Sequence, residues 1–215
     1  MKRDKHISEA VIRRLPRYYR HLDNLHYDGI TRISSQKLAD VLGCTASQIR
    51  QDLSCFGEFG QQGYGYNVSR LRAEIASILG MDRGRHCVVV GMGNLGRALV
   101  RNFPFSANGF ILDAGFDLIE DQEGKNTFGL PVYPAEDLER HLARLKPDVA
   151  VLVTPRSVAS QMANRLVTAG IKGIWNFTNI ELNIDEPEKV ILENVHFSDS
   201  LLSLSYRITA EELKK

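Results

Sequence analysis

The apolar positions near the start of the chain predict a helix. After Ser8, apolar residues recur at three- and four-residue intervals, which is the period of one face of an α-helix. The pattern is interrupted only by Pro16 and consists of Val11, Ile12, Leu15, Tyr18, Tyr19 and Leu22. A first amphipathic helix is therefore expected in this part of the chain.

Two shorter patterns follow and together predict a helix-turn-helix. Ser34 or Ser35 is placed to cap the first helix, which Gly43 ends, and Thr45 is placed to cap the second, which runs to about Phe56. Two short helices joined by a tight turn are the minimal helix-turn-helix unit. In such a unit the second helix reads DNA.

The second of these helices has an apolar side and a polar side. Ile49 and Leu53 fall on the apolar side together with Phe56, at about 100° per residue. Arg pairs with guanine, Gln pairs with adenine, and hydroxyls bind phosphates or either base. The candidate DNA-binding residues on this helix are Thr45, Ser47, Gln48, Arg50, Gln51 and Ser54. The alternative interpretation is an ordinary solvated helix face.

A hairpin is predicted immediately after this helix. From Gly57 to Val68 aromatic residues alternate around a glycine-rich tip, which is typical of two short antiparallel strands. A hairpin in this position is a wing, and Gln61, Gln62 and Tyr64 complete the candidate DNA-binding residues. Because cap, turn, helix and hairpin occur in order, a winged helix is favoured over a helical dimerisation module.

The second part of the chain begins with a strand, a glycine loop and a helix. The β-branched run 86–90 leads directly into Gly91-Met92-Gly93-Asn94-Leu95-Gly96, and a helical segment follows from Arg97. In this context Gly91 allows a tight turn, Gly93 lets backbone approach a pyrophosphate, and Gly96 lets helix and strand pack closely. All six loop residues are candidates for cofactor binding. The alternative is a glycine turn that serves packing alone.

An acidic residue lies where a dinucleotide ribose is expected. The next apolar strand, 109–116, ends at Asp117, 21 residues after Gly96. A carboxylate there binds a ribose 2′-hydroxyl and repels a 2′-phosphate, which predicts NAD(H) rather than NADP(H). Asp113 is a competing candidate, but it lies inside the strand.

Alternating strands and helices continue to the end of this part. A helix around Leu138, Leu142 and Leu145, a strand at 148–153, a helix at 157–168 and a strand at 173–177 predict an α/β, doubly wound parallel sheet of Rossmann type. The loops after the last two strands are expected at the nicotinamide end. Their candidate residues are Thr154, Pro155, Asn176 and Phe177.

A final helix is apolar along two stripes. Ser198 is placed to cap it, one stripe contains Leu201, Leu204 and Ile208, and the other contains Leu202, Tyr206 and Leu213. A core helix is the common explanation for such a pattern. Dimerisation through this helix is preferred here, because a reader of a pseudo-palindrome needs a two-fold partner.

The distribution of charged residues also distinguishes the two parts of the chain. Residues 1–80 carry 12 Lys and Arg against 8 Asp and Glu, whereas residues 81–215 carry 15 against 18. A polyanion is therefore expected to meet the first part only. The predicted domains are 1–80, a winged helix, 81–197, a Rossmann domain, and 198–215, the final helix.

Other features narrow the class of protein. Neither a signal peptide nor a membrane-spanning stretch is recognised, so a cytoplasmic protein is expected. The odd number of cysteines, at positions 44, 55 and 87, fits neither a disulfide framework nor a Cys-x-x-Cys metal site. They are expected to be free thiols, and no metal is predicted.

The chain resembles the Rex family of bacterial redox-sensing transcriptional repressors from about residue 7 to 208. The resemblance rests on seven strings: Arg14-Leu15-Pro16-Arg17-Tyr18-Tyr19-Arg20, Gln48-Ile49-Arg50-Gln51-Asp52-Leu53-Ser54, Phe56-Gly57-Glu58-Phe59-Gly60, Gly63-Tyr64-Gly65-Tyr66-Asn67-Val68, the loop 91–96, Phe116-Asp117, and Gly173-Ile174-Trp175-Asn176-Phe177. It implies a homodimer that binds inverted-repeat operators and releases them when NADH binds, with NAD⁺ competing. It also implies that the C-terminal helix is swapped into the partner subunit.

Several positions depart from the family pattern. Gln51, Gln61 and Gln62 stand where basic residues are common, which removes charges able to contact phosphate. Cys55 replaces a usual tyrosine, Arg156 lies in a loop that more often reads Val-Pro-Ala, and His196 stands where some members carry a coupling aspartate. A coupling role for His196 would make switching pH-sensitive, and the alternative is a satisfied surface histidine.

The leading hypothesis is a ligand-controlled repressor and not an enzyme. A small NAD-dependent dehydrogenase with a helical N-terminal cap is the alternative, but no His paired with a carboxylate or Arg is recognised in a substrate domain. A third possibility keeps DNA binding and changes the ligand to coenzyme A or another nucleotide. Asp117 argues against that third possibility.

Overall fold

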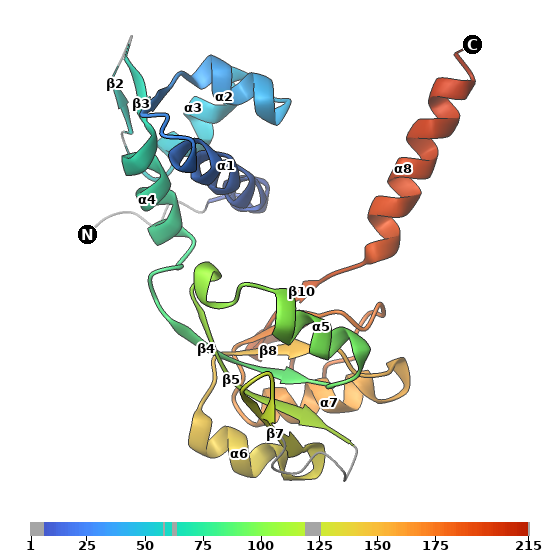
Figure 1. Cartoon of the computed structure of the whole chain (residues 1–215). Coiled ribbons are helices and arrows are strands. Elements are labelled where there is room, and N and C mark those ends of the chain that lie inside the picture. Colours follow the sequence, from blue (N-terminus) through green and yellow to red (C-terminus); the bar gives the residue numbers. More distant parts are fainter. Residues whose placement is uncertain (1–6, 58, 62–63, 119–125, 215) are drawn as a thin grey trace. The chain divides into compact units, whose positions relative to one another are not determined.

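The computed structural model describes residues 7–57, 59–61, 64–118 and 126–214, and the chain divides into two compact units (Figure 1). They are Met1–Arg83 and Gly84–Lys215. The first unit contains α1 (Glu9–Tyr27), β1 (Arg32–Ile33), α2 (Ser35–Leu42), α3 (Ala46–Ser54), β2 (Gly60–Gln61), β3 (Gly65–Asn67) and α4 (Val68–Ile78).

The first unit is the predicted winged helix. Helices α2 and α3 form the helix-turn-helix, and β2 and β3 pair as an antiparallel hairpin that β1 extends in the order β1-β3-β2. One apolar core joins all four helices to the small sheet. Its fully buried members include Leu15, Tyr18, Leu22, Leu38, Ile49, Leu53, Leu71 and Ile75.

Caps fix the ends of the helix-turn-helix. The Ser34 hydroxyl accepts from the Lys37 N–H at 3.1 Å, so Ser34 and not Ser35 caps α2. Gly43 ends α2 with a φ of 68°, a left-handed conformation that favours glycine. The Thr45 hydroxyl accepts from the Gln48 N–H at 3.1 Å and caps α3 as predicted.

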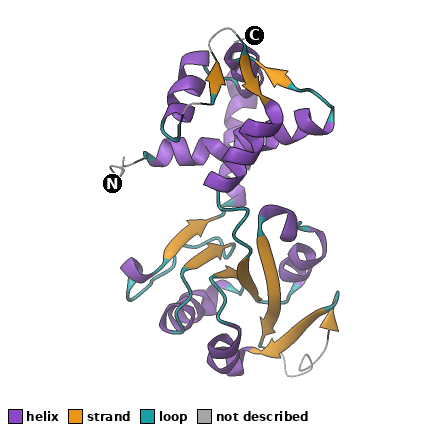
Figure 2. Cartoon of the chain, turned by 90° about the vertical axis from the view of Figure 1, so that its left-hand side faces the viewer, coloured by secondary structure: helices purple, strands orange, loops and turns teal. Residues whose placement is uncertain are grey.

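The second unit is a twisted sheet with helices on both faces (Figure 2). The strand order is β10-β9-β8-β4-β5-β7-β6, and all neighbours are parallel except β6 and β7. The strands are β4 (Arg85–Val90), β5 (Phe110–Asp117), β6 (Asn126–Thr127), β7 (Leu130–Pro134), β8 (Val149–Leu152), β9 (Gly173–Asn176) and β10 (Ile191–Asn194). The strand order reverses direction between β4 and β8. In a doubly wound sheet, ligands bind at such a reversal, in the crevice at the carboxyl ends of the two strands.

The helices cover the sheet on two sides. One core cluster joins β4 and β8 to α6 (Leu138–Leu145) and α7 (Arg156–Thr168). The other joins the same strands to α5 (Asn94–Asn102) and to Phe103, Phe105 and Trp175. The predicted α/β fold, a winged helix followed by a Rossmann-type sheet, is thereby confirmed.

Helix α8 (Phe197–Glu212) begins earlier than predicted. His196 precedes its first residue, and Ser198 lies inside its first turn, so the expectation that Ser198 caps this helix is wrong. None of its residues is buried. The three cysteines are free, as expected. Among the described residues, no helix combines the length and apolarity needed to cross a membrane.

Candidate dinucleotide and nucleic-acid sites

Two glycines of the loop after β4 allow backbone segments to pack closely. Gly91 has a φ of 103°, and a Cβ atom there would lie 2.7 Å from the Val153 carbonyl oxygen. A Cβ atom on Gly96 would lie 1.9 Å from the Gly91 carbonyl oxygen. Only glycine therefore fits these two positions. At Gly93, just before α5, a Cβ atom would meet nothing within 4 Å, so this point of the loop is open to a ligand.

Asp117 lies beside this loop. Its Oδ2 atom accepts from the Met92 N–H at 3.1 Å, and its Oδ1 atom accepts from the Leu118 N–H at 2.7 Å. The carboxylate is therefore fixed at the carboxyl end of β5, next to the turn. Asp113, the competing candidate, is the extra residue of a β-bulge opposite β4 and pairs with the His86 Nδ1 atom at 2.9 Å.

A buried hydroxyl lies at the carboxyl ends of β4 and β8, close to the glycine loop. Thr154 is 8% exposed, and among the described residues its Oγ1 atom has no hydrogen-bond partner. Its backbone nitrogen lies 3.0 Å from the position of a Gly91 Cβ atom. A buried polar atom without a partner is costly and invites a ligand or a water. An open turn, a fixed carboxylate and a free hydroxyl at one sheet edge fit a dinucleotide.

Some candidate side chains have other tasks. Met92 is fully buried and packs against Gly115, so only its backbone faces the loop. The Asn176 amide donates to the Ile180 carbonyl and to Asn194, and its oxygen accepts from the Thr178 N–H and hydroxyl. All its bonding capacity is used inside the unit, so Asn176 shapes the loop after β9.

Two other candidate residues, Phe177 and Pro155, also have structural roles within the second unit. Phe177 is 8% exposed and packs against Trp175 and Phe197, while Pro155 precedes α7.

Arg97, which the sequence reasoning did not single out, stabilises the glycine loop. Its Nε atom donates to the Met92 carbonyl at 2.8 Å. His196 lies 3.4 Å from the Glu181 carboxylate, at the start of α8.

Helix α3 presents the polar face that its sequence predicts. Ile49 and Leu53 are buried, whereas the cap and the opposite side are exposed. The exposed candidates are Thr45, Ser47, Arg50, Gln51 and Ser54, with Gln48 half-buried. In the wing, Tyr64 is 70% exposed, Gln61 lies in β2, and Gln62 lies outside the described residues.

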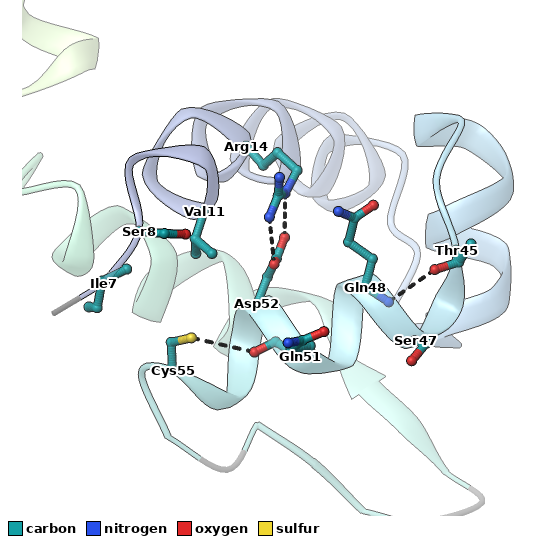
Figure 3. A pocket seen from close by; sticks show the side chains of 10 residues that line it. All are labelled: Ile7, Ser8, Val11, Arg14, Thr45, Ser47, Gln48, Gln51, Asp52 and Cys55. Carbon is teal, nitrogen blue, oxygen red and sulfur yellow. Dashed lines mark hydrogen bonds and ion pairs between the residues drawn. The ribbon is translucent and has the colours of Figure 1, made fainter. Parts of the chain in front are cut away.

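A buried acid on α3 ties this helix to α1 (Figure 3). Asp52 receives two bonds from the Arg14 guanidinium, at 2.6 and 2.8 Å, and one from the Tyr18 hydroxyl at 2.6 Å. Burial alone would raise the pKa of Asp52, but the bonds from Arg14 and Tyr18 lower it below its ordinary value. Burial and the bond to Asp52 raise the pKa of Tyr18. The sequence reasoning missed this triad.

Arg14 and Asp52 line one wall of a groove of about 660 Å³ between the start of α1 and α3 (Figure 3). Both ends of the recognition helix contribute to it. The other lining residues are Ile7, Ser8, Val11, Thr45, Ser47, Gln48, Gln51 and Cys55. The groove therefore opens on the same side of α3 as the candidate DNA-binding residues.

Comparisons with known proteins identify the family. Two family models match, "Putative DNA-binding protein N-terminus" over residues 6–54 and "CoA binding domain" over residues 82–180. A "Redox-sensing transcriptional repressor Rex" of Thermoanaerobacter pseudethanolicus is 47% identical over 100% of this chain and 95% of its own length. That of Clostridioides difficile is 48% identical over 94% of this chain and 96% of its own. The chain belongs to the Rex family.

Solved Rex-family structures share the whole fold. The crystal structure of RSP in complex with β-NAD⁺ and operator DNA has a TM-score of 0.89 and 48% identity, covering 98% of this chain and 96% of that one. RSP in complex with β-NADH has the same TM-score at 45% identity, covering 98% of both chains. RSP thus binds both nucleotide forms and DNA.

Rex membership decides between the functional hypotheses. It confirms that the chain is a redox-sensing transcriptional repressor, because its full-length relatives are named as repressors and not as enzymes. It also confirms NADH and NAD⁺ as the family's nucleotides, through RSP. The names of the full-length relatives give no support to coenzyme A as the ligand, although the family model of the second unit is described by it.

Proposed function

We propose that this chain binds inverted-repeat operators as a homodimer and releases them when NADH binds, with NAD⁺ competing for the same site. The observation that carries the proposal is the presence, in one Rex-family chain, of a winged helix and an open glycine loop beside Asp117. Because DNA and the NADH pool share the bacterial cytoplasm, the proposal places the protein there.

The residues of the second unit would hold the dinucleotide from several sides. The open backbone at Gly93 and the N-terminus of α5 suit the pyrophosphate, since a helix N-terminus stabilises anions. The Asp117 carboxylate suits a ribose hydroxyl, and the buried Thr154 hydroxyl, which follows β8, suits the nicotinamide end. When bound, the nucleotide supplies a ring whose charge and shape change on reduction.

The residues of the first unit would divide DNA reading between two grooves. Ser47, Gln48 and Gln51 on α3 suit base edges in the major groove, because amides and hydroxyls donate and accept there. The wing, with Gln61, Gln62 and Tyr64, suits the neighbouring minor groove. Two such units are needed for an inverted repeat.

Helix α8 supports the homodimer. Every side chain of its two apolar stripes is more than half exposed, from 52% at Ile208 to 83% at Leu213. A soluble chain rarely leaves so much contiguous apolar surface in water without a partner. A second copy would cover both stripes if α8 packed between the subunits. The swapped arrangement implied by the family resemblance is such a packing.

Release requires two arrangements of the dimer. A shift from mostly operator-competent to mostly incompetent needs roughly 5 kcal/mol of differential binding, shared over two nucleotide sites. Rotation of the second units would alter the separation of the winged helices. A changed separation no longer matches half-sites set one or more DNA turns apart.

NADH is expected to release the protein from a duplex selected from random DNA, whereas NAD⁺ is not. Asp117→Ala should raise the NADH concentration for half-release at least tenfold, because a hydrogen bond to a charged group contributes about 1.5–3 kcal/mol. Fluorescence anisotropy of the duplex measures the release. Asp113→Ala, which removes a carboxylate from the same strand, is the matched control and should behave as wild type. Equal responses to both nucleotides contradict the redox switch.

Leu204→Lys in α8 is expected to weaken the dimer at least tenfold. The lysine places a charge inside an apolar interface, where it lacks a partner. Sedimentation equilibrium measures the association. Ser203→Lys, on the polar strip of the same helix, adds the same charge and should leave association unchanged. Unchanged association of Leu204→Lys would show that α8 does not form the interface, and an equal loss in Ser203→Lys would show that the apolar stripe is not what associates.

A further inference from the structure

Arg32 lies beside the wing and is held by it. Its Nη1 atom donates to the Tyr64 carbonyl at 3.3 Å, and its guanidinium lies over the Tyr64 ring, 5.7 Å from the centroid. Both residues are exposed. A guanidinium fixed over an aromatic ring keeps its remaining N–H donors directed outward at a small entropic cost.

The backbone around Arg32 is fixed by close strand packing. Arg32 pairs opposite Asn67, and Ile33 pairs opposite Tyr66. Gly65 has a φ of 70°, and a Cβ atom there would lie 2.6 Å from the Ile33 carbonyl oxygen. Strand β1 is therefore locked against the wing strand β3, and Arg32 belongs to the wing although it lies about thirty residues earlier in the chain.

Arg50 connects the same segment to the recognition helix. Its Nη1 atom donates to the Ser35 hydroxyl at 3.0 Å, and Ser35 is the first residue of α2, three residues after Arg32. Segment 32–35 thus contacts the wing at one end and α3 at the other.

Neither arginine is neutralised by a carboxylate. Four other arginines of the first unit are paired with acids, Arg13 with Glu9, Arg14 with Asp52, Arg72 with Asp23 and Arg83 with Asp82. Among the ion pairs of the described residues, Arg32 and Arg50 have none. Two exposed cations between the helix and the wing form a surface that suits a polyanion.

We propose that Arg32 and Arg50 contact the sugar–phosphate strand that separates the two grooves. The inference rests on the proposed function: with α3 in the major groove and the wing on the adjacent minor groove, one phosphate strand must pass between them, where segment 32–35 lies. Guanidinium forks bind phosphate oxygens in a bidentate way without reading sequence. Arg50, expected from sequence to read a base, is thereby assigned to the backbone.

The test compares Arg32→Gln with wild type on two duplexes, one selected from random DNA by wild-type protein and one scrambled. Binding is followed by anisotropy between 50 and 200 mM salt. Each lost phosphate contact should reduce the slope of log K against log salt by about 0.9 per subunit. Affinity should fall by the same factor on both duplexes. Arg50→Gln should behave in the same way, and Arg32→Lys, which keeps the charge, should retain most of the slope.

Arg83→Gln is the matched control, since it removes one arginine of the same unit that already faces Asp82. It should leave the slope unchanged. An unchanged slope for Arg32→Gln, or a loss confined to the selected duplex, would overturn the phosphate assignment. A selection in which wild-type protein enriches no duplex from random DNA would instead overturn the proposed function. Unaltered thermal unfolding of the variants excludes misfolding as the cause.

Discussion

Replacing Gly96 by alanine is expected to abolish measurable NADH binding. The new Cβ atom would lie 1.9 Å from the Gly91 carbonyl oxygen, far inside van der Waals contact, so loop and helix must move apart. The displaced atoms are backbone on both sides and cannot rotate away. Titration with NADH measures the loss, and thermal unfolding followed by the fluorescence of Trp175, the single tryptophan of the chain, measures the destabilisation of the second unit.

Gly93→Ala is the matched comparison. Its Cβ atom would meet nothing within 4 Å in the protein itself, so the variant should unfold at the wild-type temperature. The methyl group nevertheless occupies the open side of the turn, where a pyrophosphate would approach, and NADH affinity should fall at least tenfold. Normal NADH binding by Gly96→Ala, or by Gly93→Ala, would contradict the dinucleotide site at this loop.

The glycine loop of the proposed dinucleotide site was largely predictable because its signals are local. The strand, the three glycines and the helix lie within 17 residues of chain, from His86 to Asn102. The choice of Asp117 over Asp113 needed only the end of the strand, and the structure separates the two: one carboxylate contacts the loop, and the other pairs with His86. The helix-turn-helix was predictable for the same reason, since caps are written in adjacent residues.

The missed features depend on contacts between distant residues. Strand β1 has only two residues and forms by pairing with β3. A segment this short cannot show the alternation of apolar and polar residues from which strands are predicted. Strands β7 and β10 are short and were not predicted from the pattern. Asn176 was expected to bind the cofactor, yet its partners are Ile180, Thr178 and Asn194, and only the fold reveals that they surround it.

Asp52 shows the same limit in the DNA-binding unit. An acid in a recognition helix reads from sequence as a repulsive neighbour of phosphate or as a reader of cytosine. In the structure it is 2% exposed and faces α1, 38 residues back along the chain. Its charge is balanced by Arg14, so it orients α3 rather than facing DNA.

Asp52→Ala is expected to destabilise the first unit by about 3 kcal/mol, because it leaves Arg14 without its partner and the buried Tyr18 hydroxyl unsatisfied. Urea unfolding separates the units: Trp175 fluorescence reports the second, and far-UV circular dichroism reports both. The circular dichroism transition should move to lower urea while the fluorescence transition stays in place. Tyr18→Phe, which removes one bond and keeps the ion pair, should cost about half as much.

The pH dependence of this effect has a definite sign. Since the pKa of Asp52 is lowered in the folded protein, its stabilising contribution is present above the unfolded value, near pH 4, and is lost as the pH falls through the folded value. The difference between wild type and Asp52→Ala should therefore be constant from pH 8 to pH 5 and shrink below about pH 4. A difference that grows on acidification, or a fluorescence transition that shifts equally, would show that Asp52 does not act as the buried anion between α1 and α3.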